Sequence, residues 1–425
     1  MLPRRRLFLA VAIAAVIALP AGVLAGLCVG NACRRQERAV GRIPFCSLPQ
    51  DLRSLIAAGF RDGRSPHVLT VTAEEEIAGS TAIPIAFAGT GVTPGAEVPA
   101  GTTLDAVAPT LAEVIELRRP DPSVRSGEAA SGVASGEAPR LVLLVAWKGV
   151  TSRELERKPE AWPVLRGLLE DGVGTLGAVP GSLPLDTAAL LATIGTGTLP
   201  RDHGITGSLL RNEKGDVVEP WSEGLPFSVV ATLAEHLDEL GGQAPRIGLV
   251  GGDETDRGLV GGDWYVAHDT DDVRVKPGLD KQIAAAERLL TSGYGNDLAT
   301  DLLGVAMEGT ISQLDRALGI ILIAAERSSG GSFAVALAGA PWPAREDSSR
   351  RSPIELETEL QRRMDADVVE AIVGNGVFLD QEAMTTSGLS DDRVVAALRD
   401  MKAPSGERVF LDVFPAIAVT FARYC

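Results

Sequence analysis

The sequence predicts an α/β fold with a mostly parallel central sheet and helices on both of its faces. Continuous apolar runs of strand length occur at residues 141–146 (LVLLVA), 302–306 and 333–338, as expected of strands buried on both faces. Segments with helical periodicity separate these runs, and such alternation is typical of a parallel sheet. The 425 residues suffice for one large domain or two medium ones.

Other elements follow from the same periodicities. Before the first buried run, helices are expected at residues 49–60 and 102–117, and β-rich segments at 67–72 and 82–88. After it, the helices expected are 162–169, 187–194, 227–240, 283–290, 314–325, 354–372 and 393–401, with a strand at 246–250 and a β-rich close at 409–422.

Composition limits the possible functions. The formal net charge is −16, which opposes binding to nucleic acid or to an anionic membrane through a broad basic face. Aromatic residues make up only 4% of the chain, so the core must consist mainly of Ala, Val, Leu and Ile. We expect no nucleic-acid partner.

The first 30 residues have the pattern of a membrane anchor. Three arginines, residues 4–6, precede an uncharged apolar run at residues 7–30, and about 20 residues cross a bilayer as a helix. The basic flank favours a cytoplasmic start. We therefore expect an uncleaved signal anchor at 1–30, a polar linker at 31–45, and a single-pass protein of the cell membrane with its soluble domain outside the cytoplasm. A cleaved signal peptide is the alternative.

One motif series is much more specific. Residues 163–207 read PVLRGLLEDGVGTLGAVPGSLPLDTAALLATIGTGTLPRDHGITG, and this stretch is similar to the signature of the type I phosphodiesterase/nucleotide pyrophosphatase family of the alkaline phosphatase superfamily. The resemblance places Thr187 in the nucleophile slot and implies structural roles for the residues that follow at the family's spacing, Thr196, Gly197, Pro200, His203 and Gly204. A hydroxyl at a helix start faces unpaired N–H groups that attract phosphate. The alternative is that Thr187 or Asp186 only caps the helix.

A second resemblance comes out of order. Residues 83–120 look like the family's closing segment, in which a strand and a glycine-rich turn lead to a helix with the motif residues Asp105, Pro109 and Thr110. The resemblance therefore implies a circular permutation. Residues 46–120 would be the C-terminal part of the alkaline phosphatase-like fold, residues 121–138 a flexible linker rich in Ser, Gly, Ala and Glu, and residues 139–425 the catalytic-type part.

The permutation also implies a disulfide. It would bring the new ends of the fold close together, near Cys46 and Cys425, and disulfides persist in an exported domain. Free thiols are the alternative, because spacing alone does not establish connectivity.

Active members of the family hold two metal ions, usually zinc, with about six Asp and His ligands, and most of these positions are altered here. Lys148 stands where the first carboxylate is expected, and a protonated Lys cannot bind a metal. Residues 307–310, 339–341 and 74–79, at the other ligand positions, contain no His. We therefore expect no metal site and no cofactor. Lys148 would instead place a fixed positive charge beside Thr187, suited to binding an anionic group.

Two functions are compatible with these observations, and the sequence leaves open whether any activity remains. The first is a membrane-anchored pseudoenzyme that binds an anionic small molecule or a partner protein. The second is an active phosphodiesterase or phosphatase that uses Thr187 and a reorganised site for two zinc ions, built from Asp253, Asp256, Asp263 and His268. A third possibility is another kind of exported α/β protein.

Overall fold

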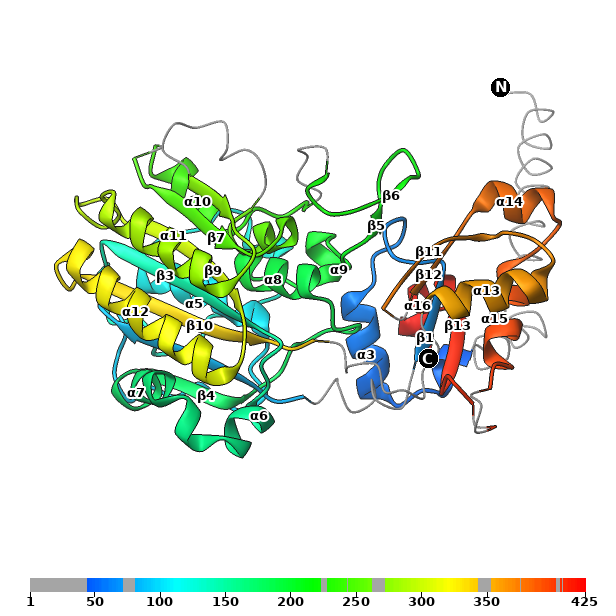
Figure 1. Ribbon diagram of the computed structural model, residues 1–425, viewed down its shortest axis with the longest axis horizontal. Helices are drawn as coiled ribbons and strands as arrows, with labels where there is room; N and C mark the ends of the chain where they lie inside the picture. Colours follow the sequence, from blue (N-terminus) through cyan, green and yellow to red (C-terminus); the bar gives the residue numbers. More distant parts are fainter. Residues whose placement is uncertain are drawn as a thin grey trace, which may run out of the picture.

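The computed structural model describes residues 44–71, 81–222, 228–242, 244–261, 272–342, 353–374, 376–402, 406 and 408–425. They form a larger lobe around a seven-stranded sheet and a smaller lobe around a four-stranded sheet, with α3 (Gln50–Gly59) between them (Figure 1). The membrane span expected at residues 7–30 lies outside these ranges. Within them, no helix combines the length and the apolar character needed to cross a bilayer.

The large sheet has the strand order β4-β2-β10-β3-β9-β7-β8. Its members are β4 (Val173–Ala178), β2 (Ile83–Gly89), β10 (Phe333–Ala340), β3 (Leu141–Lys148), β9 (Asp301–Glu308), β7 (Ile247–Gly251) and β8 (Asp272–Val275). The last five strands of this order run parallel, whereas β2 is antiparallel to β10 and β4 is antiparallel to β2. The expected mostly parallel sheet is therefore confirmed.

Helices cover both faces of this sheet, as the buried strand β3 shows. Val142, Leu144 and Ala146 pack into the core of one face, and the intervening residues Leu141 and Leu143 pack into that of the other, because successive side chains of a strand point in opposite directions. The first face carries α5 (Val107–Val114), α8 (Thr187–Thr196) and α10 (Leu233–Leu240); the second carries α7 (Pro163–Asp171), α11 (Leu279–Thr291) and α12 (Ile311–Ser329).

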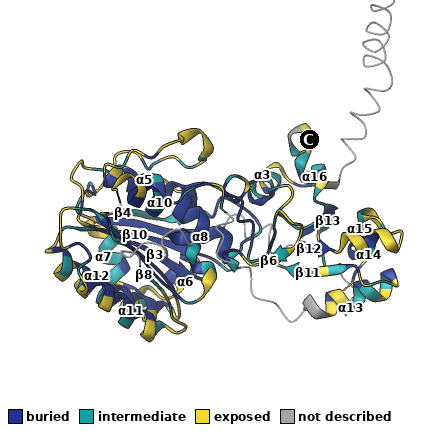
Figure 2. Ribbon diagram, turned by 90° about the horizontal axis from the view of Figure 1, so that it is seen from above, coloured by how far each residue is buried: buried dark blue, intermediate teal, exposed yellow. Residues whose placement is uncertain are grey.

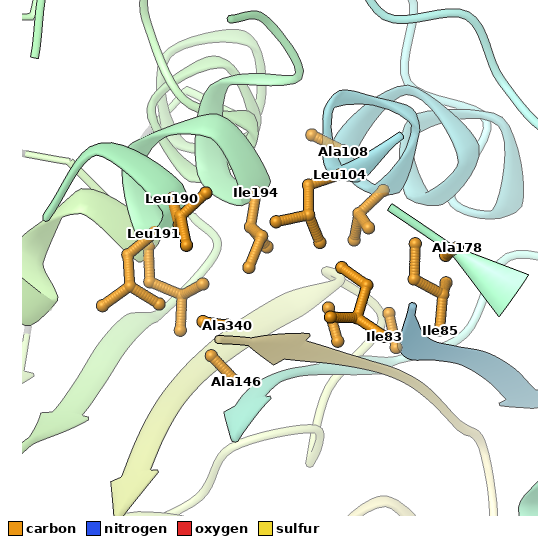
Figure 3. Close-up of a cluster of buried hydrophobic side chains, with 14 of the residues drawn as sticks. Ile83, Ile85, Leu104, Ala108, Ala146, Ala178, Leu190, Leu191, Ile194 and Ala340 are labelled. Atoms are coloured by element: carbon orange, nitrogen blue, oxygen red, sulfur yellow. The ribbon is translucent and has the colours of Figure 1, made fainter. Parts of the chain in front are cut away.

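The core under α8 is built from small and branched aliphatic side chains. Leu190, Leu191 and Ile194 of α8 face Ala146 and Ala340 at the ends of two strands (Figure 3). In Figure 2 the strands are buried and the exposed residues lie on the outer surfaces of the lobe. The alanines let α8 lie close to the sheet, so the start of α8 and the ends of the strands share one region.

The smaller lobe contains an antiparallel sheet of order β11-β12-β1-β13. Its strands are β11 (Val369–Val373), β12 (Gly376–Leu379), β1 (Val68–Val71) and β13 (Asp412–Pro415), and the helices beside it are α13 (Pro353–Met364), α14 (Gln381–Thr386), α15 (Asp391–Arg399) and α16 (Ile417–Thr420). The helix expected at residues 354–372 is wrong in its second half. Asp365 adopts a left-handed conformation (φ 54°) directly after α13, and the chain then enters β11.

The segment at residues 121–138, expected to be a flexible linker, makes specific contacts in the structure. Ala130 and Val133 are buried, and Ala134 forms a β-bridge with Val92. The hydroxyl of Ser126 donates to Asp105 (2.8 Å) and accepts from the N–H of Leu199 (2.9 Å). The segment is rich in small residues, as linkers are. Here the small side chains let its backbone pack closely against neighbouring segments. The permuted domain boundaries themselves stay a prediction.

Cys46 and Cys425 form a disulfide across 379 residues of sequence, as the permutation implied. The bond joins η1 (Pro44–Ser47) to the end of η7 (Ala422–Tyr424). It therefore connects the first described residues to the last on the smaller lobe.

Candidate functional site

An open cleft of about 280 Å³ lies where the parallel strands of the large sheet end, the usual position of ligand sites in α/β folds. It brings together the two residues that the sequence singled out, Lys148 and Thr187. The complete lining is Lys148, Asp186, Thr187, Ala188, Ser208, Asp253, Thr255, Glu308 and Trp342.

Lys148, the last residue of β3, is paired with two carboxylates. Its Nζ lies 2.9 and 3.1 Å from the two carboxylate oxygens of Asp256 and 3.3 Å from Oδ2 of Asp253. The side chains of Lys148 and Asp256 are 4% and 0% exposed, whereas that of Asp253 is 56% exposed. Burial by itself would lower the pKa of Lys148, but the two carboxylates outweigh burial and raise it, so Lys148 is charged at neutral pH.

The buried carboxylate of Asp256 has two compensating partners, the ammonium of Lys148 and the backbone N–H of Gly252. Burial raises the pKa of this carboxyl group, and the ammonium of Lys148 opposes the rise. The N–H of Gly252 also donates to Asp256, at 2.6 Å. A buried charge that lacks partners is strongly unfavourable, and here the ion pair and the backbone supply them. The pair is therefore a closed structural unit with little remaining capacity for a ligand.

Close packing between α8 and η6 (Glu254–Leu259) holds Asp256 in place. A Cβ on Gly195 of α8 would lie 2.6 Å from the carbonyl oxygen of Leu259, and a Cβ on Gly258 would lie 2.7 Å from the backbone nitrogen of Ala192. Such distances leave no room for a side chain on either element. The glycines thus let η6 contact the backbone of α8 and bring its aspartate under Lys148.

Thr187 is the first residue of α8, but the N-terminus of this helix already carries a negative group. Asp186 is the N-cap, and its Oδ1 accepts from the N–H groups of Ala188 (2.9 Å) and Ala189 (3.4 Å). Its Oδ2 accepts from the hydroxyl of Ser208 at 2.8 Å. The carboxylate takes the donors and the helix-dipole field that would otherwise attract a phosphate.

The motif residues after Thr187 have structural roles. Thr196 donates to the carbonyl of Ala192 at 2.6 Å. Gly197 and Gly204 adopt left-handed conformations (φ 71° and 87°) that end α8 and α9 (Pro200–His203). Pro200 is the first residue of α9, where its fixed φ suits a helix start.

The two motif groups meet in space, although they are far apart in sequence. A Cβ on Gly197 would lie 2.7 Å from Cδ of Pro109. Asp105 accepts from Thr103 and Ser126 beside this contact, and the hydroxyl of Thr110 donates to Ala106 (2.7 Å) and accepts from Ala130 (2.9 Å). The turn η2 (Leu104–Ala106), which bears Asp105, and α5, which bears Pro109 and Thr110, are thus fixed against the end of α8.

The histidines of the described ranges are neutral hydrogen-bonding groups. Burial lowers the pKa of His203 to about 3, and its Nδ1 accepts from Ile205. Burial and then Arg119 lower the pKa of His236 to about 4, and Nε of Arg119 donates to its Nδ1 at 3.1 Å. His236 is 6% exposed, and Arg119, which bonds to it, is also buried. Nδ1 of His67 accepts from Leu379, which ties β1 to β12.

The donor set of the cleft does not fit the two zinc ions that the family implies. The first ligand position is a lysine whose ammonium is engaged by Asp256. The strand β10 leads to Pro341 and Trp342, which have no ligand atom suited to zinc. Among the described residues, no group of three or more His, Cys, Asp or Glu is arranged to hold a metal. Of the alternative site, Asp263 and His268 lie outside the described ranges.

Sequence reasoning identified Lys148 and Thr187 and named Asp186 and Asp253 in other roles, but it missed Trp342, Glu308 and Ser208. Trp342 packs over the turn after β3, since a Cβ on Gly149 would lie 3.2 Å from its ring. Glu308 ends β9, and Ser208 caps Asp186 from a loop. Glu308 ends a strand that the sequence predicts to be parallel. Because ligand sites lie at the carboxyl ends of such strands, its position would have indicated it as a candidate site residue, as for Lys148. No pattern in the sequence indicated Ser208.

Comparison with known proteins agrees with the motif assignment. Residues 142–232 match the sequence profile of the type I phosphodiesterase/nucleotide pyrophosphatase family. No curated protein sequence matches the chain significantly.

Solved structures with some similarity include alkaline phosphatase PafA, at 14% identity over 61% of this chain and 76% of the other with a TM-score of 0.45. Phosphonoacetate hydrolase from Sinorhizobium meliloti has 15% identity over 62% and 74% with a TM-score of 0.40. Murine ectonucleotide pyrophosphatase/phosphodiesterase 5 has 14% identity over 47% and 56% with a TM-score of 0.36. The expected family resemblance is confirmed by the profile match: residues 142–232 carry the sequence pattern of the type I phosphodiesterase/nucleotide pyrophosphatase family.

Proposed function

We propose that this chain is a non-catalytic phosphodiesterase-like protein, held at the outer face of the cell membrane by residues 7–30, whose function is to bind a partner protein. The observation that carries the proposal is the buried pair of Lys148 and Asp256 at the strand ends. A cation fixed in the protein stands where the family places the first metal ligand. Without metal ions, the hydroxyl of Thr187 lacks activation and the transition state lacks charge stabilisation.

The surroundings of the cleft favour a protein partner over an anionic small molecule. Lys148 is the only cationic residue among the cleft-lining residues that the structure describes, and Asp256 and Asp253 already engage it. Asp186 and Glu308 add two further carboxylates. An anion would meet this negative field and would compete with a buried ion pair for Lys148.

The direct test combines metal analysis with turnover. Full-length protein, purified without chelators, is analysed for zinc and assayed with a nitrophenyl phosphodiester, beside a Thr187→Ala variant. We expect less than about one zinc per chain and the same background hydrolysis for both proteins. Two zinc ions per chain, with turnover that disappears in Thr187→Ala, would overturn the proposal in favour of the phosphodiesterase that uses Asp253, Asp256, Asp263 and His268.

A binding experiment separates the two kinds of ligand. Inorganic phosphate and sulfate are titrated into the protein by calorimetry, with a Lys148→Met variant as the comparison. We expect no binding tighter than about 1 mM for either protein. Micromolar phosphate binding that Lys148→Met abolishes would support the anion-binding role of Lys148 instead.

A further inference from the structure

The last part of the described chain carries an exposed apolar face. Four of the nine exposed large apolar side chains in the described ranges lie between residues 411 and 425. Three of them, Ile417, Phe421 and Tyr424, are 56%, 41% and 54% exposed. Single exposed apolar residues need no explanation, but a cluster of them marks an interaction surface.

These three residues share one side of a short helical segment. They are spaced by four and three residues through α16 and η7, so they fall on one face. The rings of Phe421 and Tyr424 lie 6.2 Å apart. The opposite side of α16 is buried, with Ala418 and Val419 only 3% and 4% exposed. We call Ile417, Phe421 and Tyr424 the apolar face.

The apolar face lies beside the point where the preceding chain joins the lobe. Cys425 directly follows Tyr424 and is bonded to Cys46 in η1, and α16 packs against both η1 and α3. The 13 residues at 31–43 separate Pro44 from the expected membrane span, and even fully extended they reach at most about 45 Å. Figure 2 shows α16 at the edge of the molecule, away from the large sheet.

We propose that the apolar face rests on the outer surface of the lipid bilayer and fixes the orientation of the protein there. Aromatic and aliphatic side chains on one face of a short helix suit the interface, where Tyr and Phe sit with their rings at headgroup level. The linker at 31–43 has four arginines and one glutamate, so the segment that directly precedes η1 in the sequence is positively charged despite the net −16 of the chain. The inference rests on the proposed membrane anchoring.

The test places a tryptophan on the apolar face of the full-length protein. Phe421→Trp is compared with Leu298→Trp, because Leu298 is 91% exposed on the larger lobe, just before β9. Each protein is reconstituted into phosphatidylcholine nanodiscs with and without brominated acyl chains, and the added emission is taken as the difference from the unsubstituted protein. We expect bromine to remove about half of the added emission at position 421 and less than about a tenth at position 298, since an interfacial face lies ~5–10 Å into the bilayer boundary.

The other outcomes are distinct. Flotation of the nanodiscs shows whether the chain is anchored at all, and failure to float would overturn both the anchoring and this inference. Anchored protein with equal, weak quenching at both positions would overturn the inference alone. Emission at position 421 that shifts to the blue with increasing protein concentration, independently of bromine, would assign the face to a second copy of the chain and would equally overturn it. A non-reducing gel verifies that the Cys46–Cys425 bond is intact in both variants.

Discussion

At the scale of single residues, the cleft is defined by one lysine and its two carboxylate partners. The resemblance to the family indicated from sequence alone that Lys148 replaces a ligand, because its position at the end of a buried strand is a local pattern. Asp256 could not be identified as its partner, since the two are 108 residues apart and their contact depends on how η6 packs under α8. The sequence named Asp256 only as a metal ligand of an alternative site.

Replacing Lys148 should destabilise the fold. Lys148→Met leaves the buried Asp256 without its counter-charge, and we expect a loss of about 3 kcal/mol in the free energy of unfolding, measured by denaturant titration. Asp253→Asn should cost less than about 1 kcal/mol, because Asp253 is half exposed. The double variant Lys148→Met/Asp256→Asn should recover about half of the loss. Equal effects of Lys148→Met and Asp253→Asn would show that the buried pair has no special role.

The buried histidines predict sensitivity to acid. The pKa of His236 is lowered to about 4 from an ordinary value of 6.5, so the unfolded chain binds a proton at a higher pH than the folded one. The contribution of the neutral His236 to the free energy of unfolding is present above pH 6.5 and is lost as pH falls toward 4. At pH 5 the loss is about 2 kcal/mol relative to pH 7.5.

Urea titrations at several pH values, for the unsubstituted protein and for His236→Gln, measure this contribution as the difference between the two curves. The difference cancels the opposite trend of buried carboxyl groups such as Asp301 and Asp315, whose pKa values burial raises. Parallel curves between pH 7.5 and 5 would contradict the assignment of His236 as a neutral group.

At the scale of elements, the start and end of a single helix could be predicted from local sequence, but the pairing of distant strands could not. The expected helix at 187–194 is α8, which begins at Thr187 because Asp186 caps it and ends at Gly197 because only glycine adopts φ 71° without strain. The smaller sheet was not predicted. The β-rich segments expected at 67–72 and 409–422 contain β1 and β13, but β11 and β12 were not expected. Because β1 pairs with segments more than 300 positions later, no pattern within a window reveals how the four strands pair.

The glycine contact between α8 and η6 gives a sharp test at this scale. Gly195→Ala places a Cβ against the backbone of Leu259 and Gly258, and we expect a loss of about 1–3 kcal/mol in stability from overpacking. Gly167→Ala in α7 is the matched control, because a Cβ there meets nothing within 4 Å. The control should gain about 0.5–1 kcal/mol from helix propensity. Thermal unfolding of both variants measures the contrast, and stabilisation by Gly195→Ala would contradict the packing described.

At the scale of the whole molecule, α3 lies between the two lobes, and one disulfide connects the first and last described segments within the smaller lobe. The mostly parallel character of the large sheet and its helical cover were predictable, because β3, β9 and β10 are apolar runs, whereas the order of its strands was not predicted. The permuted order of the motif groups is consistent with their meeting at Gly197 and Pro109. The lobe built around β1 depends on contacts between early and late segments, which composition does not encode.

Removal of the disulfide should weaken the smaller lobe. Cys46→Ser with Cys425→Ser opens a loop of several hundred residues, and we expect a loss of about 2–5 kcal/mol in the free energy of unfolding. Hydrogen exchange measures where the loss occurs. Faster exchange should be confined to η1, α16, β1 and β13, while the strands of the large sheet keep their protection. Uniform acceleration in both lobes would contradict this division.

The central place of β1 in its sheet has a consequence for biosynthesis. During translation, β1 leaves the ribosome long before its partners: one of its edges lacks β12 for roughly 310 further residues, and the other lacks β13 for roughly 340. The larger lobe can complete its sheet in that interval, whereas the smaller lobe must close last, together with oxidation of its cysteines. Until the late strands arrive, the unpaired edges of β1 are open to mispairing with other chains.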